Sequence, residues 1–150
     1  MDLVFKKRVY RPSPEFWGDF SRNEFRDHFG FSSTHLVNLE IKGNVYGFTF
    51  DTGAFISYAP DFLLEHMGTE PSFEGYVRGA TPKEECKIKV KVAKLSFRIQ
   101  DDMGKESTQL SAWFAFHPFD RGPFLLGMKD VIEKMGLIME WDEEKLILQI

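Results

Sequence analysis

The sequence contains a single cysteine, Cys86, among 150 residues. An intrachain disulfide is therefore excluded, and a reducing compartment such as the cytoplasm is expected. Nothing in the local sequence supports Cys86 as a nucleophile, so we interpret it as a half-buried thiol at a strand end. No stretch approaches the roughly eighteen apolar residues of a membrane span, and no signal-peptide pattern is found at the N-terminus. We therefore expect a soluble, cytoplasmic protein with no membrane partner.

Clustered positive charge is also scarce, with 19 Lys and Arg against 23 Asp and Glu. The basic cluster Lys6–Arg8 is too short to bind a nucleic-acid backbone. The four histidines lack metal-ligand spacing, and no glycine-rich phosphate loop is present. The adjacent acids Asp101–Asp102 and Glu143–Glu144 are expected to be solvated turn residues rather than glycosidase carboxylates or cation ligands. We expect no nucleic-acid partner, no metal and no cofactor.

Phenylalanine, in contrast, is abundant, with 16 residues. A Phe-rich core explains this better than an apolar substrate cleft, and the length fits one domain. After Pro12 and Pro14, apolar rings recur every four or five residues, which predicts one or two short amphipathic helices. These rings are Phe16, Phe20, Phe25 and Phe29. We expect residues 1–34 to be an aromatic, partly helical extension, and residues 35–150 to be the main domain.

From residue 35 onward the pattern is typical of strands. Alternation predicts a hairpin of Leu36–Ile41 and Val45–Phe50 with a turn at Gly43-Asn44. Further strands are expected at Cys86–Val92, Leu95–Ile99, Leu110–Phe116, Leu137–Trp141 and Leu146–Ile150, with short helices at Asp61–Met67 and Lys129–Met135. The predicted fold class is mainly β with one or two short helices.

The tetrapeptide Asp51-Thr52-Gly53-Ala54 follows the second strand of the hairpin directly. An acid before a small hydroxyl residue and glycine suits carboxylate chemistry from a tight loop, because glycine lets the backbone approach and donate to the acid. The chain holds this motif once. If Asp51 is one half of a carboxylate pair, its partner must come from a second copy of the chain.

The order of elements around this motif resembles that of the retropepsin-like aspartic proteases. A hydrophobic strand, the Asp51–Ala54 motif, a glycine-tipped hairpin, the segment Leu125–Gly127, a helix and an apolar final strand follow one another. The resemblance runs from about Leu36 to Ile150. It implies a closed antiparallel β-barrel, and a homodimer that acts as an aspartic endopeptidase on a peptide or protein substrate without a cofactor or metal.

The resemblance also implies a role for each residue of the motif. Asp51 matches the catalytic acid, and Thr52 matches the residue whose hydroxyl braces the two active-site loops across the dimer. Gly53 matches the position whose backbone lies beside the carboxylates. Ala54 is the residue found there in retroviral members of the family. These four residues are therefore expected to form the catalytic loop.

Two other elements are assigned by the same resemblance. Leu125–Gly127, with Leu126 and Gly127 as supporting residues, matches the segment that passes beneath the catalytic loop. The hairpin from about Tyr76 to Val90 matches the flap, with Gly79, Ala80 and Thr81 near its tip as substrate-binding residues. Glycine at the tip would ease flap opening. The closing strand Leu146–Ile150 would contribute to the subunit interface.

Two identical acids are useful because they cannot both be ionised at short range. Carboxylates about 3 Å apart repel by roughly 5 kcal/mol at an effective dielectric of about 20. Such a pair shares one proton over a wide pH range, as aspartic proteases generally do. The charged member then takes a proton from water, while the protonated member polarises the scissile carbonyl.

The sequence departs from the family pattern in two places. Many retroviral members have an acid after the motif and an Arg after the Leu-Leu-Gly equivalent, whereas this chain has Phe55 and Met128. The paired change predicts a sulfur–aromatic contact in place of an ion pair. The flap segment Lys83–Glu85 is also more charged than that of a retroviral flap.

Two other functions remain open. The first is a protein of this fold that no longer cuts and serves as a dimerisation or peptide-binding module; the intact Asp51–Gly53 argues against it, since a binder does not need the acid. The second is a small β-barrel for an apolar ligand, which predicts a monomer and gives Asp51 no role.

Overall fold

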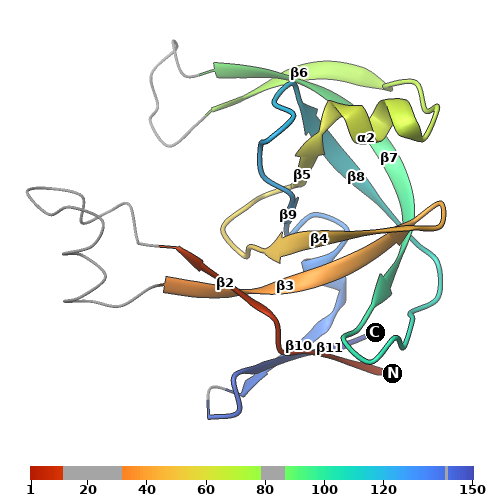
Figure 1. Ribbon diagram of the computed structural model, residues 1–150. Helices are drawn as coiled ribbons and strands as arrows, with labels where there is room; N and C mark the ends of the chain where they lie inside the picture. The colour runs from red at the N-terminus through yellow and green to blue at the C-terminus, as the bar shows by residue number, and fades with distance from the viewer. Residues whose placement is uncertain (12–31, 79–86, 141) are drawn as a thin grey trace, which may run out of the picture.

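The computed structural model describes residues 1–11, 32–78, 87–140 and 142–150. The described residues form two antiparallel-rich sheets with one short α-helix (Figure 1). The strands are β1 (Asp2–Phe5), β2 (Arg8–Arg11), β3 (Ser32–Ile41), β4 (Asn44–Phe50), β5 (Ser57–Pro60), β6 (Phe73–Arg78), β7 (Lys87–Gln100), β8 (Leu110–His117), β9 (Leu125–Leu126), β10 (Gly136–Glu140) and β11 (Lys145–Gln149). The helix α2 covers Asp61–His66, and the 3-10 turn η3 covers Ile132–Lys134. The predicted mainly β class is confirmed.

The larger sheet has the strand order β2-β3-β4-β9-β5-β8-β7-β6. The predicted hairpin is confirmed as β3 and β4, which pair antiparallel from Leu36–Thr49 to Ile41–Asn44. Its turn lies one residue earlier than the predicted Gly43-Asn44, at Lys42 and Gly43, whose φ angles are 48° and 85°. Two left-handed residues give a turn whose twist matches that of the flanking strands, and glycine takes this conformation without steric cost.

The strand β7 is one continuous strand of 14 residues, so the two separate strands predicted here are wrong. Along its length it pairs first with β6 and then with β8, and its last three residues pair with Asn38–Glu40 of β3. Val92 belongs to a small apolar cluster, while the next residue, Ala93, belongs to the main core. The alternation of apolar residues therefore shifts where the strand passes from one core to the other.

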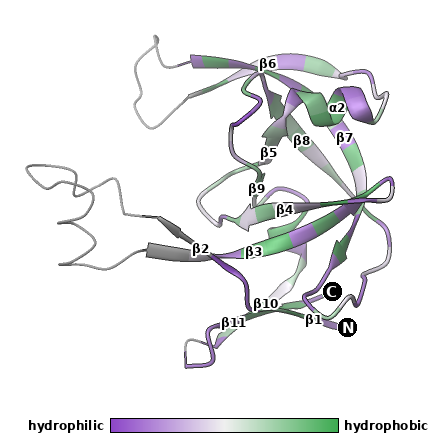
Figure 2. Ribbon diagram, viewed as in Figure 1, coloured by the Kyte–Doolittle hydropathy of each residue, from purple (hydrophilic) through white to green (hydrophobic). Residues whose placement is uncertain are grey.

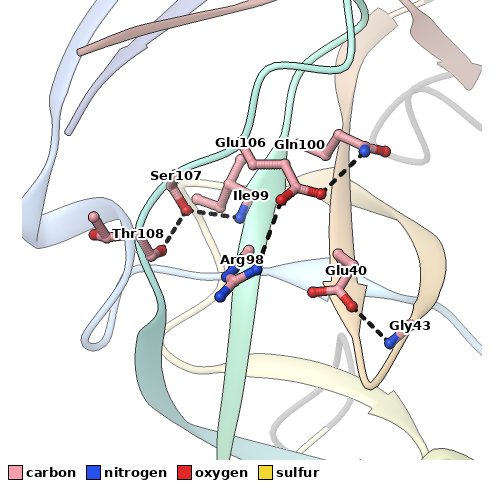
Figure 3. Close-up of polar contacts among 8 residues, drawn as sticks. All are labelled: Glu40, Gly43, Arg98, Ile99, Gln100, Glu106, Ser107 and Thr108. Atoms are coloured by element: carbon pink, nitrogen blue, oxygen red, sulfur yellow. Dashed lines mark hydrogen bonds and ion pairs between the residues drawn. The ribbon is translucent and has the colours of Figure 1, made fainter.

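Polar contacts hold the turn that follows β7 against the β3–β7 junction (Figure 3). The Ser107 hydroxyl accepts the Ile99 backbone N–H at 2.9 Å and donates to the Thr108 carbonyl at 2.7 Å. Glu106 accepts from the Gln100 side-chain amide at 3.3 Å and lies 3.8 Å from the Arg98 guanidinium. These contacts bring the chain back toward β8.

The expectation of a closed barrel is wrong. The β3–β7 pairing folds the large sheet back on itself, but β2 and β6 each have only one partner strand among the described residues. The β3–β7 contact also covers only three residue pairs, because β7 leaves β8 near Phe97 and reaches β3 only at its end. The sheet is therefore strongly bent and keeps edge strands.

The smaller sheet has the order β1-β11-β10, with β10 and β11 forming the predicted C-terminal hairpin. Both N-terminal strands are missing from the sequence-based prediction: β1 pairs with β11, and β2 pairs with β3. The N-terminal strands are thus part of the sheets, while the predicted helices of the extension lie in residues 12–31, outside the described residues. The proposed domain boundary near residue 34 stays a prediction.

The aspartates of the Asp101-Asp102 turn hold β1 in place. Asp101 is only 5% exposed, which corrects the expectation that both acids are solvated. Its carboxylate accepts the backbone N–H groups of Met103 at 2.9 Å, Lys105 at 2.8 Å and Val4 at 3.4 Å. Asp102 accepts the backbone N–H groups that follow β1, at 2.6 Å and 3.3 Å. Charge-assisted bonds of this kind satisfy buried carboxylates.

The main core is rich in phenylalanine, as the composition predicts. Three phenylalanine rings contact the ring of Phe114. The rings of Phe48 and Phe97 meet it edge to face, and the ring of Phe116 stacks on it. Hydrophobic and hydrophilic residues alternate along β7, so one face of the strand turns toward the core (Figure 2). The helix predicted at Asp61–Met67 is confirmed as α2, and Gly68, which follows it, has a φ of 62°.

The second predicted helix, at Lys129–Met135, is wrong, because only the three-residue turn η3 forms there. Asp130 has a φ of 62°, a left-handed conformation that interrupts an α-helix. No helix in the described part of the chain has the length and apolar character needed to cross a membrane.

Candidate active site

The strand β4 carries Asp51 to the surface and β9 holds it there. The two strands run parallel, with Thr49 opposite Leu125 and Phe50 opposite Leu126. The Thr49 N–H donates to the Phe124 carbonyl at 2.8 Å, and the Asp51 N–H donates to the Leu126 carbonyl at 3.0 Å. The backbone of Asp51 is therefore fixed by the same ladder that holds β4, while its side chain is partly exposed.

The loop after Asp51 turns back onto the aspartate. The Gly53 N–H donates to the Asp51 carboxylate at 2.9 Å, and the Ala54 N–H donates to the Asp51 carbonyl at 3.2 Å. A Cβ at Gly53 would lie 3.2 Å from the same carboxylate oxygen. The close approach that the sequence predicts between glycine and the acid is thus present in the structure. Thr52 and Gly53 are exposed, whereas Ala54 is buried.

Gly127 passes beneath this loop with no room for a side chain. A Cβ there would lie 2.5 Å from the Ile56 carbonyl oxygen and 2.9 Å from the Ala54 carbonyl oxygen. The Met128 N–H donates to Ala54 at 2.9 Å. Leu126 is fully buried. The predicted supporting residues Leu126 and Gly127 therefore do contact the Asp51–Ile56 loop.

Two hydroxyl residues that the sequence analysis missed also support the loop. Ser57 is fully buried, and its hydroxyl accepts the Gly127 N–H at 2.9 Å. Thr34 on β3 donates its hydroxyl to the Phe50 carbonyl, just before Asp51. The position of Ser57 at the start of an apolar strand is the sequence signal that could have indicated its supporting role. Thr34 gave no such signal, because its contact depends on strand pairing.

Phe55 and Met128 do not show the contact predicted for them. The Phe55 side chain is 74% exposed, whereas Met128 is partly buried against the main core. Their loops are joined through the backbone instead, since the Lys129 N–H donates to the Phe55 carbonyl at 2.8 Å. The exposed ring of Phe55 leaves a large apolar side chain beside Asp51 at the surface.

The arms of the predicted flap are present as β6 and β7, which pair from Phe73–Val92 to Arg78–Lys87. The proposed tip residues, Gly79, Ala80 and Thr81, lie outside the described residues, as does Cys86. A small apolar cluster contains Val77 and Ile88 from these arms and Ile56 from the loop after Asp51. The arms and the Asp51 loop are therefore packed together.

Tyr58 of β5 belongs to the same cluster and lies opposite Leu125 of β9. Burial raises the pKa of the Tyr58 hydroxyl above its ordinary value. Among the described residues, no group of three or more His, Cys, Asp or Glu side chains is arranged to hold a metal ion. The chemistry that these residues themselves offer is that of one carboxylate at the end of a rigid strand.

No model of a known protein family matches the sequence, and no curated protein matches it significantly. Among solved structures, the chain is similar to a retropepsin-like aspartic protease from Rickettsia conorii, with 17% identity, a TM-score of 0.54, and coverage of 99% of this chain and 98% of the other. It also matches a simian foamy virus (mac) protease, with 21% identity, a TM-score of 0.44 and coverage of 68% and 99%. A foamy viral protease-reverse transcriptase gives 21% identity and a TM-score of 0.46, covering 65% of this chain and 11% of that one.

Proposed function

We propose that this chain, which has the retropepsin-like fold of the Rickettsia structure, is an aspartic endopeptidase that acts as a homodimer. The observation that carries the proposal is the setting of Asp51. Its carboxylate is partly exposed, accepts the Gly53 N–H at 2.9 Å and belongs to a loop anchored on β9. A binding module does not require a carboxylate held in this way.

In the proposed reaction, the Asp51 carboxylates of two chains face each other and share one proton. The ionised carboxylate takes a proton from a water molecule, and that water attacks the scissile carbonyl carbon. The protonated carboxyl donates a hydrogen bond to the carbonyl oxygen, where negative charge develops. The carboxyl group that took the proton from water then passes it to the amide nitrogen, and the C–N bond of the tetrahedral intermediate breaks to release the amine and the new carboxyl end. The Gly53 N–H keeps the acid oriented throughout these steps.

The surrounding residues supply positioning. Thr52 is exposed on the loop and is free to brace the loop of a second chain, the role that the sequence resemblance implies for its hydroxyl. Met128 holds the loop from below by donating its N–H to the Ala54 carbonyl at 2.9 Å, and Gly127 allows this close approach. A peptide would lie extended between this loop and the flap, and would pair with backbone groups as an added strand.

The proposal is tested by peptide cleavage assays from about pH 4 to 7. Asp51→Asn keeps the size of the side chain but removes its acid–base function, so we expect activity to fall by at least about a hundredfold. Asp142→Asn, a change at an exposed turn residue, is the matched control and should keep wild-type activity. Equal activity in wild type and Asp51→Asn would overturn the proposal.

The same assay separates the alternative functions. A dimer that cuts no peptide of a degenerate library but retains some of its members would be a peptide-binding module. A monomer that neither cuts nor binds peptides would favour the small barrel for an apolar ligand. Size measurement in parallel with the assay is therefore part of the test.

A further inference from the structure

An open groove of about 490 Å³ lies beside β4, the strand that leads to the Asp51 loop. Its walls are formed by Leu36 of β3, by Gly47 and Thr49 of β4, and by the segment from Arg121 to Phe124 before β9. A Cβ at Gly47 would lie 3.1 Å from the Leu36 side chain, so glycine at this position leaves the groove open. The groove therefore combines apolar side chains with polar groups, among them the cationic side chain of Arg121.

The groove borders the strand that leads to the candidate catalytic residue. Thr49, which lines it, precedes Asp51 by two residues, or about 7 Å along an extended chain. Phe124 and Leu126 accept the backbone N–H groups of Thr49 and Asp51, so the groove and the acid occupy successive positions of one ladder. A side chain close to the scissile bond would reach this groove.

The segment that carries Arg121 is held rigidly by His117. The buried His117 ring accepts the Phe119 N–H at 3.3 Å through Nδ1 and contacts the Pro123 carbonyl at 2.9 Å through Nε2. The Gly122 N–H donates to the Phe119 carbonyl at 3.0 Å, which closes a turn with Arg121 in its third position. A Cβ at Gly122 would lie 2.3 Å from the ring, so glycine allows this packing.

Arg121 is exposed at the groove, and no carboxylate within the described part of the chain forms an ion pair with it. Some other exposed cations among the described residues are paired, for example Lys89 with Glu74 at 3.0 Å. A guanidinium in a groove that also contains Leu36 and Phe124 suits a side chain with an aliphatic stem and a carboxylate end, since the guanidinium binds a carboxylate with two parallel hydrogen bonds.

We propose that Arg121 determines specificity by binding the carboxylate of a Glu or Asp side chain of the peptide, close to the scissile bond. This rests on the proposed function, because the groove is placed relative to Asp51. It also narrows that function, because it names the class of side chain that is preferred close to the scissile bond. Leu36 and Phe124 contact the stem of the acidic side chain, and Arg121 contacts its end.

The first experiment measures cleavage of a degenerate decapeptide library by mass spectrometry. The best-cleaved peptide is then synthesised with Glu or Gln at each position near the cut. At one position, kcat/KM should be about three- to tenfold higher for Glu than for Gln in the wild type. Arg121→Gln should bring this ratio to about one, and the Arg121→Glu variant should prefer peptides with Lys at the same position. Arg98→Gln, a change at the far end of β7, is the matched control and should keep the ratio.

The second experiment does not depend on cleavage. Immobilised Asp51→Asn protein and the Asp51→Asn/Arg121→Gln double variant are each used to select peptides from the same library. Enrichment of acidic residues at one position by the first protein alone supports the role of Arg121, even if no peptide is cut and the proposed protease function fails. The inference is overturned if cleavage depends on Asp51 but neither experiment shows an acidic preference that Arg121→Gln removes. The proposed protease function still stands in that case.

Discussion

At the scale of single residues, Ser57 is a support that lies outside the catalytic loop. Its buried hydroxyl accepts the Gly127 N–H at 2.9 Å. Ser57→Ala leaves that N–H unpaired in the interior, so we expect the free energy of unfolding to fall by about 1–3 kcal/mol. We also expect kcat to fall, because Gly127 lies under the Asp51 loop.

Urea unfolding and cleavage assays measure these two effects. Ser111→Ala is the matched control, since Ser111 lies exposed on β8 and its loss should change neither quantity. If Ser57→Ala behaves like Ser111→Ala in both measurements, the hydrogen bond contributes nothing to the loop.

A second residue-scale prediction concerns Tyr58, whose pKa burial raises above 10.0. The folded state therefore holds the hydroxyl proton more strongly than the unfolded state. The contribution of this residue to stability is complete below about pH 10, and it is lost as the pH rises through the raised pKa. Thermal melts between about pH 8 and 11 should show a smaller alkaline loss in Tyr58→Phe than in the wild type. Superimposable pH profiles for the two proteins would contradict this.

At the scale of elements, the attachment of β1 depends on Asp101. Asp101→Ala removes acceptors from three backbone N–H groups, including that of Val4, in a site only 5% exposed. We expect a loss of about 2–4 kcal/mol in the free energy of unfolding. The amides of β1 should also exchange with solvent faster.

Asp102→Ala is the informative comparison for this prediction. Its carboxylate accepts from Lys6 and Lys7 in an exposed setting, so its removal should cost less. Equal stability losses in the two variants would mean that burial of Asp101 does not matter. Hydrogen exchange then decides whether β1 is loosened at all.

The sequence predicts those elements whose pattern is local. The hairpin of β3 and β4 is readable because alternation and a glycine turn lie within 19 residues of chain, from Ser32 to Phe50. β7 is misread as two strands because Val92 and Ala93 are both buried, one in each core. β1 is missed because its partner β11 lies at the other end of the chain.

The residues of the candidate site likewise differ in how far their roles can be predicted from the sequence. The Asp51 loop is predictable because Gly53 bonds to an acid two residues away. The roles of Ser57 and Asp101 cannot be predicted from the sequence. The side chain of each accepts a hydrogen bond from a backbone N–H group that only tertiary folding brings near. The left-handed Asp130, which prevents the expected helix, likewise carries no signal in its residue type.

At the scale of the whole molecule, the proposed dimer needs a surface beside Asp51 and a second contact. The closing strand β11 is already paired on both edges, by β1 and β10. Its predicted contribution to an interface is therefore limited to its outer face and to the edges of its sheet. Leu137 and Ile138 on β10 are 41% and 40% exposed, and Phe55 is 74% exposed. We propose these apolar side chains as parts of the interface, since exposed apolar groups favour association.

The dimer makes a prediction that no single-chain mechanism shares. Wild type and Asp51→Asn are mixed, allowed to exchange subunits, and assayed at a fixed total concentration. If both carboxylates are required, a mixed dimer is inactive, so an equal mixture should keep only about one quarter of the wild-type activity. A chain that cuts alone would keep about one half. Activity proportional to the wild-type fraction of the mixture would overturn the paired-carboxylate mechanism. Activity proportional to the square of that fraction would place one Asp51 from each chain in a shared site.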